Sequence, residues 1–221
     1  MRTNYVTNPS IETAITGWYE VDTNLPAGDP TIERVAGGYI GSYETKWSYT
    51  AGTGDTTGTA DQYCLYSGAG TAAQDEVWTV SAYIKLGSGT TSGVTVSLRI
   101  PYYDASNTYI GVVSGEDISG SLTTDYQRFY YTGTLPSTAT ISQVGAYLHV
   151  GSVADGDAWD LRSDCWLLEK TGTLGDYFDG STTDTETWTY AWTGTEHAST
   201  STATEVEAGF VGMTVTKLLQ G

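Results

Sequence analysis

Short runs in which apolar and polar residues strictly alternate constrain the fold of this chain more than any other feature of its sequence. In the run 78–86, one face collects Val80, Ala82, Ile84 and Leu86. The same alternation returns over 94–100 and, more briefly, over 109–112, and two further runs of similar length and spacing follow at 127–132 and 144–150. This is the period of a β-strand that has one buried and one solvated face. No run keeps a 3.6-residue apolar period over three turns, so we expect almost no helix.

Gly- and Ser-rich segments separate these runs and predict turns at 87–89, 104–107, 119–121 and 155–157. Many short strands divided by such turns are typical of an antiparallel β-sandwich. A chain of 221 residues is long enough to bury one such core and to carry a small appendage. We therefore predict an all-β protein with a single main sandwich.

The character of the sequence changes after Glu169. The segment 171–175 resembles a short linker, and the part beyond it is rich in Thr and aromatic residues. We place a boundary near Gly172, which divides the chain into a sandwich over 1–172 and a β-rich C-terminal extension over 173–221. In the extension, alternation puts three large rings on one side: Trp188, Tyr190 and Trp192. The run 210–216 is apolar enough to require a partner surface.

The charge of the chain excludes some partners. The 26 acidic residues against 9 Lys and Arg give a formal charge of −17, which repels a phosphate backbone, so we expect no nucleic acid. No apolar run of about 18 residues is present, and no signal peptide follows the N-terminus, so we expect neither membrane insertion nor export. The two cysteines, Cys64 and Cys165, carry no metal-site spacing, and we expect both to be small buried thiols.

Three segments carry a resemblance to a known family. The string Asn8-Pro9-Ser10-Ile11-Glu12, followed by Gly17-Trp18, resembles the opening of the calcium-binding carbohydrate-binding modules, which have a galactose-binding-like jelly roll. The segments 80–85 and 164–169 resemble the middle and last strands of that family. Two positions depart from the pattern, since Ile11 stands for the usual Phe and Tyr126 for the usual Trp. The resemblance implies that the sandwich is a jelly roll.

The C-terminal part resembles a second group of proteins. Its segments 177–181, 190–195 and 197–201 are similar to an ending found in minor tail proteins of phages that infect actinobacteria. This ending implies a virion component at the tail tip or baseplate, assembled in the host cytoplasm beside other phage tail proteins. With the jelly roll it implies adhesion to host cell-wall glycan, and we expect a homo-oligomer, for which a trimer is one arrangement.

The same family pattern suggests a structural calcium site. Calcium takes six to eight oxygen ligands, usually carboxylates completed by carbonyls and water. The family places the first and last strands side by side, so Glu12 and Asp164 are candidate ligands, with Asn8 as a weaker one. The alternative is that both acids are ordinary surface or hydrogen-bonded carboxylates.

Sugar binding requires aromatic faces with polar groups beside them. If the outward-facing positions of the predicted strands line one concave sheet, the candidate ligand-binding residues are Tyr83, Arg99, Tyr109, Tyr147 and His149. Outward tyrosines on a sheet also serve packing and solubility, and that alternative stays open. For Trp188, Tyr190 and Trp192 we favour an interface over a ligand, with either a neighbouring tail subunit or this jelly roll as the partner surface.

We do not expect an enzyme. The only histidines, His149 and His197, lie in no hydrolase or zinc-protease motif, and pairs of acids occur by chance among 26 carboxylates. The leading hypothesis is a phage minor tail protein that contributes to glycan adhesion. One alternative is a jelly roll kept as a structural spacer without a ligand. Another is the carbohydrate-binding module of a secreted glycoside hydrolase.

Overall fold

The computed structural model describes residues 1–23, 25, 28–50 and 58–207, and within strand β5 it leaves the side chains of 61–69 undescribed. Within these residues the protein is built almost entirely from β-strands, and the one helical element is the short 3-10 turn Ser119–Ser121. No helix in the described part is long and apolar enough to cross a membrane. The strands are β1 Arg2–Asn4, β2 Tyr19–Thr23, β3 Thr31–Ala36, β4 Tyr43–Thr50, β5 Gly58–Thr71, β6 Val77–Gly89, β7 Thr95–Tyr103, β8 Tyr109–Ser114, β9 Gln127–Thr134, β10 Gln143–Val153, β11 Ala158–Glu169, β12 Trp188–Trp192 and β13 Ser201–Glu205.

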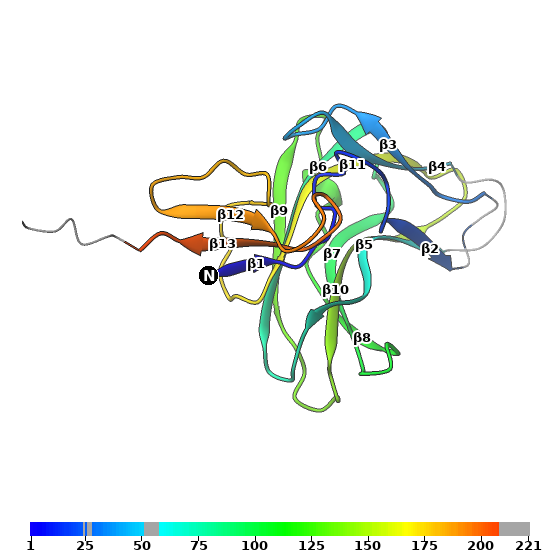
Figure 1. Cartoon of the computed structure of the whole chain (residues 1–221). Coiled ribbons are helices and arrows are strands. Elements are labelled where there is room, and N and C mark those ends of the chain that lie inside the picture. The colour runs from blue at the N-terminus through cyan, green and yellow to red at the C-terminus, as the bar shows by residue number, and fades with distance from the viewer. Residues whose placement is uncertain (24, 26–27, 51–57, 208–221) are drawn as a thin grey trace, which may run out of the picture.

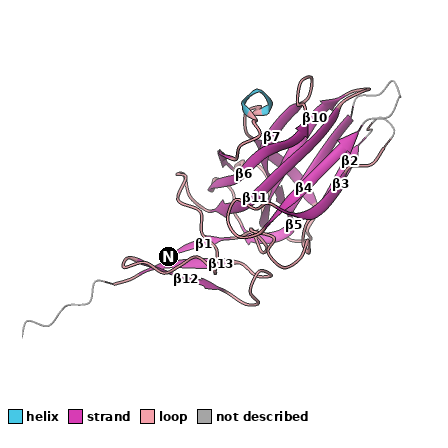
Figure 2. Ribbon diagram, turned by 90° about the horizontal axis from the view of Figure 1, so that it is seen from above, coloured by secondary structure: helices cyan, strands magenta, loops and turns pink. Residues whose placement is uncertain are grey.

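Two five-stranded antiparallel sheets lie face to face and form the sandwich (Figure 2). The first sheet has the order β2-β5-β10-β7-β8, and the second has the order β3-β4-β11-β6-β9. The chain crosses repeatedly between the two sheets, for example from β5 to β6 and from β6 to β7. The prediction of an all-β jelly-roll sandwich is confirmed.

The core lies between the two sheets and follows the predicted alternation. Val80, Ala82 and Ile84 are fully buried, and Leu86 packs partly buried at the margin of the core. The largest side chains of the core are four tryptophans, each at most 2% exposed: Trp47, Trp78, Trp159 and Trp166. Burial of these apolar side chains supplies most of the free energy that holds the sheets together.

The turn predicted at 87–89 is wrong, because Gly87 and Gly89 belong to β6. A Cβ atom at Gly87 would lie 2.6 Å from both Arg162 Nε and Asp160 Oδ1 on the neighbouring strand β11. Glycine is therefore required here because side chains of β11 cross close to the backbone, not because the chain reverses. The predicted turns at 104–107 and 155–157 are confirmed.

A third sheet stands beside the sandwich and contains strands from both ends of the chain (Figure 1). Its order is β1-β13-β12, with Thr3 paired to Thr202 and Tyr190 paired to Ala203. The N-terminal strand thus pairs with the C-terminal extension. The division of the chain after residue 172 stays a prediction, and the run 210–216 lies outside the described residues.

Candidate functional site

The open face of the first sheet carries a row of aromatic and basic positions. Pairing between strands places Tyr147 of β10 opposite Arg99 of β7, and Tyr19 of β2 in line with them through β5. In the next row His149 lies opposite Ser97. Directly paired residues of an antiparallel ladder project on the same side of the sheet. This side faces away from the core, because the alternating residues Val96, Leu98 and Ile100 occupy the other face.

Exposure varies across this face. Tyr109 on the edge strand β8 is 53% exposed and Tyr19 on the opposite edge is 40% exposed. Tyr147 and His149 are buried, at 3% and 7% exposed, with ring centroids 6.5 Å apart. Arg99 is half-buried between these extremes. A ligand on this face would meet the exposed tyrosines and the guanidinium first.

The expectation that Tyr83 converges with the other four residues is wrong. Tyr83 lies on β6, in the second sheet, and its ring stacks on Tyr39 at a centroid distance of 3.8 Å. The Arg128 guanidinium lies 5.7 Å from the Tyr83 ring centroid. Alternation correctly predicts that Tyr83 points away from the core, but it carries no information about which of two sheets a strand joins.

The carboxylates of Glu12 and Asp164 both bind the same loop. The Glu12 carboxylate accepts hydrogen bonds from the main-chain amides of Ser42, at 3.0 and 3.1 Å, and Tyr43, at 3.1 Å. Asp164 Oδ2 accepts from the amides of Tyr39, at 2.7 Å, and Ile40, at 3.1 Å. We call this arrangement the carboxylate clasp, formed by Glu12 and Asp164 around the loop 39–43. The loop itself was not predicted from the sequence.

Burial makes Asp164 the unusual member of the clasp. Its side chain is fully buried, and this burial raises its pKa to about 7, although amide hydrogen bonds from Ile40, Cys165 and Tyr39 act in the opposite direction. A bound cation would offset the cost of burying that charge. Among the described residues, no group of three or more His, Cys, Asp or Glu side chains is placed to hold a metal. The two carboxylates fit calcium only if main-chain carbonyls or water complete the ligand set.

Asn8 has a structural role that is separate from the clasp. Its side-chain nitrogen donates to the carbonyls of Ala14, at 2.8 Å, and Thr16, at 3.1 Å. Its main-chain carbonyl accepts a hydrogen bond from Trp18 Nε1 at 3.0 Å. No hydrogen bond joins Asn8 to either carboxylate within the described residues, and its buried Oδ1 has no partner there. Asn8 thus fixes the loop that leads to Trp18, and its role as a ligand stays a prediction.

The N-terminal segment is also the surface on which the C-terminal extension docks. The buried Asn4 amide donates to the carbonyls of Trp166, at 2.9 Å, and Phe178, at 3.1 Å. Ser10 Oγ donates to Asp179 Oδ2 at 3.2 Å. These contacts join the two motifs that carry the family resemblances. The sequence indicated no role for Asn4, because one asparagine near a terminus gives no pattern.

Aromatic residues of the extension pack on this chain itself. Trp188 and Tyr190 contact a small core of Leu167, Phe178 and Ala203, and the Tyr190 and Phe178 ring centroids lie 5.9 Å apart. Trp192 Nε1 donates to Ser181 Oγ at 3.1 Å, and its ring lies against His197. All three rings of the predicted stripe are half-buried. Whether a neighbouring subunit covers their remaining surface stays a prediction.

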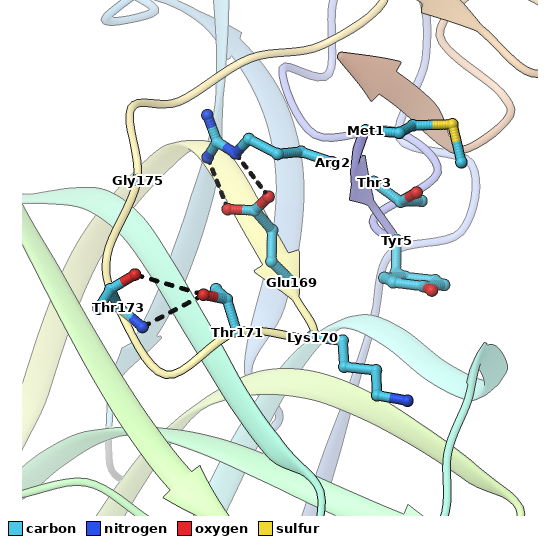
Figure 3. A pocket seen from close by; sticks show the side chains of 9 residues that line it. All are labelled: Met1, Arg2, Thr3, Tyr5, Glu169, Lys170, Thr171, Thr173 and Gly175. Carbon is cyan, nitrogen blue, oxygen red and sulfur yellow. Dashed lines mark hydrogen bonds and ion pairs between the residues drawn. The ribbon is translucent and has the colours of Figure 1, made fainter. Parts of the chain in front are cut away.

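A cavity of about 400 Å³ lies where β1 meets the end of β11 (Figure 3). At its wall the Arg2 guanidinium donates to both oxygens of Glu169, at 3.0 and 2.7 Å. A Cβ atom at Gly175 would overlap this guanidinium, so a larger residue there would require the Arg2 side chain to move. The ion pair joins β1 to β11, the last strand of the sandwich. The cavity therefore belongs to the surface where the C-terminal extension packs on the N-terminal segment and the end of β11, which we call the docking joint.

Cys165 follows Asp164 on β11 and is a fully buried free thiol, as predicted. Burial is the main cause that raises its pKa, and the neighbouring Asp164 raises it further. The neutral thiol is therefore the favoured form of Cys165. The side chain of Cys64 lies outside the described residues.

Comparison with known proteins supports the fold. No protein-family model matches the sequence, and no curated protein matches it. Among solved structures, the enzymatically active domain of tailspike protein 4 of bacteriophage CBA120 matches with a TM-score of 0.50 and 12% identity, over 75% of this chain and 21% of that chain. A carbohydrate-binding module of the β-sandwich superfamily matches with a TM-score of 0.51 and 16% identity, over 75% of this chain and 60% of that chain. This chain spans less than two thirds of either structure, and at these identities the likeness shows a shared β-sandwich fold.

Proposed function

We propose that this chain is a phage minor tail protein whose jelly roll binds host cell-wall glycan through the open face of the first sheet. The observation that carries the proposal is the pair of exposed tyrosines, Tyr19 and Tyr109, on the two edge strands of this face, with the half-buried Arg99 between them. Aromatic faces with polar groups beside them are the surfaces that pyranose rings require. The sandwich is of the kind found in a carbohydrate-binding module and in a phage tailspike.

The C-terminal ending supports the phage setting. Its resemblance to endings of minor tail proteins of actinobacteriophages agrees with a position at the tail tip, next to other tail proteins. In a homo-oligomer, several weak sites would act together, because linked copies raise the effective ligand concentration. No catalytic step is part of the proposal.

The proposal is tested by binding of the purified chain to cell walls isolated from actinobacteria and to a panel of their oligosaccharides. Tyr109→Ala should weaken binding by about tenfold or more, equivalent to about 1.4 kcal/mol. The matched control is Tyr130→Ala, because Tyr130 is 58% exposed but lies on β9 in the second sheet. Equal loss in both variants, with folding intact by circular dichroism, would contradict the assignment of the face.

A second candidate function is a structural spacer in the tail that binds no glycan. The burial of Tyr147 and His149 favours it, because neither ring presents a free surface to a sugar. The same titrations separate the two functions. Absence of binding to every cell wall and oligosaccharide would favour the spacer.

We also propose that a structural calcium ion binds at the carboxylate clasp, away from the glycan face. The support is the placement of Glu12 and Asp164 on one loop and the cost of burying the Asp164 charge. If calcium binds there, adding it at pH 8 should raise the melting temperature, and a chelator should reverse the gain.

A further inference from the structure

Arg99 differs from most other cations of this protein because no acidic side chain that the structure describes is paired with it. Among the described residues, five basic side chains pair with carboxylates: Arg2, Lys46, Lys85, Arg162 and Lys170. The Arg34 guanidinium donates to the carbonyls of Ile11 and Glu12. Arg99 and Arg128 are the two described side chains left without either arrangement. In a chain with 26 acidic residues, a half-buried guanidinium without a carboxylate is available for an external anion.

The geometry around Arg99 fixes part of the guanidinium and leaves the rest open. Its Nε donates to the buried Ser97 Oγ at 3.1 Å, which holds the plane of the group. The two terminal nitrogens make no hydrogen bond within the described residues. A guanidinium presents parallel N–H groups that match the two oxygens of a carboxylate or a phosphate. Arg99 is thus already oriented for an anion before any ligand arrives.

The surroundings of Arg99 also suit a saccharide. Tyr147 is its direct partner across the ladder, and His149 occupies the next position on the same face. In the register of the ladder, Asp61 of β5 is paired with His149, and its side chain lies outside those that the structure describes. Asp61 lies two strands from β7, about 10 Å at the usual strand spacing. The net charge of −17 acts against anions at long range, but at physiological salt it is screened beyond about 8 Å, so contacts at the face decide binding.

We infer that the ligand of this face is an anionic glycan, one that carries a carboxylate or a phosphate, and that Arg99 binds the anionic group beside the tyrosines. The inference rests on the proposed glycan-binding function and narrows the class of its ligand. The common chemistry is an anion with two or more oxygens, attached to a sugar or polyol chain. A uronic acid and a polyol phosphate are the two sources of that chemistry.

The test is calorimetric titration of the full chain at 0.15 M salt (about physiological) with three probes: galacturonic acid trimer, glycerol phosphate trimer and uncharged galactose trimer. The first and the last differ in the oxidation state of C6 in each sugar residue, so comparing them isolates the effect of the carboxylates. We expect at least one anionic probe to bind about tenfold or more tightly than the galactose trimer, a difference of about 1.4 kcal/mol. Which probe it is distinguishes the two sources of the anion.

Variants of Arg99 separate the inference from the proposed function. Arg99→Gln should lower the affinity for the anionic probe to that for the neutral probe. Arg99→Lys should retain part of the preference, because lysine keeps the charge but lacks the paired N–H groups of the guanidinium. Arg128→Gln is the matched control, since Arg128 also has no acidic partner in the described part of the chain but lies on the second sheet. This variant should change affinity by less than about twofold.

The results of these titrations distinguish failure of the inference from failure of the proposed function. Equal affinity for the galactose and galacturonic acid trimers, unchanged in Arg99→Gln, would overturn the inference and leave glycan binding in place. Absence of binding by all three probes and by host cell walls would overturn the inference together with the proposed function. Weaker binding of the anionic probe in Arg128→Gln than in Arg99→Gln would move the anion site to the other sheet and overturn the inference.

Discussion

Protonation of Asp164 is expected to control the stability of the carboxylate clasp. Burial raises the pKa of Asp164 to about 7 in the folded protein, from an ordinary value of 3.8. The folded state therefore holds the proton more tightly than the unfolded state. The resulting contribution to the free energy of unfolding is complete below the unfolded pKa and is lost as the pH rises through about 7. A difference of about three units between the folded and unfolded pKa values corresponds to at most about 4 kcal/mol of the free energy of unfolding.

The substitution Asp164→Asn, in the presence of a chelator, tests whether ionisation of Asp164 lowers stability. The amide cannot ionise, and its oxygen can still accept a hydrogen bond from the loop 39–43. Between pH 4 and pH 8 (values chosen to span the two pKa values), the wild type should lose up to about 4 kcal/mol relative to the variant. Urea denaturation followed by tryptophan fluorescence measures this difference. Asp125→Asn, at an exposed aspartate, is the control and should follow the wild type.

Stabilisation by calcium gives a second comparison of the wild type and Asp164→Asn. At pH 8, calcium at 100 times its dissociation constant would stabilise the wild type by about 2.7 kcal/mol. Asp164→Asn should gain much less, because it lacks one carboxylate ligand. If the free energy of unfolding of wild type and variant changed equally with pH in chelator, burial of Asp164 would not be the cause of the pH dependence. Equal stabilisation of both by calcium would place the ion elsewhere.

Three further substitutions test the loop 39–43 and the docking joint. Gly41→Ala should lower stability by about 1–3 kcal/mol more than Gly156→Ala. Both glycines have a positive φ, but only at Gly41 would a Cβ overlap the Glu12 carboxylate. Equal melting temperatures would contradict this. Phe178→Ala, at a side chain 1% exposed, should destabilise the docking joint by about 3–5 kcal/mol. Proteolysis should then cleave the extension before the sandwich unfolds. Simultaneous cleavage of both parts would show that they unfold together. Asn4→Ala should loosen the same joint, because it removes two buried hydrogen bonds to main-chain carbonyls, whereas Asn4→Asp should recover only the bonds in which the side-chain oxygen is the acceptor.

Much of the sandwich follows from local patterns in the sequence. The phase of strand β6 predicted that Val80, Ala82 and Ile84 are buried and that Tyr83 faces away from the core, as the structure confirms. Family resemblance also predicted that Glu12 and Asp164 belong to one region, and both bind the same loop. The predictions for β6 succeed because the direction of a side chain depends on the local two-residue period of its own strand.

What the tertiary structure decided is which segments meet. It placed Tyr83 on the sheet opposite Arg99, paired β1 with β13 across the whole chain, and put Gly87 beneath side chains of β11 rather than in a turn. None of these is encoded in a local period, because strand pairing is selected by burial and hydrogen bonding between segments far apart in the sequence. The sequence by itself determined an all-β chain, its core faces and its acidic balance, whereas long-range packing alone determined which of its polar side chains share a face.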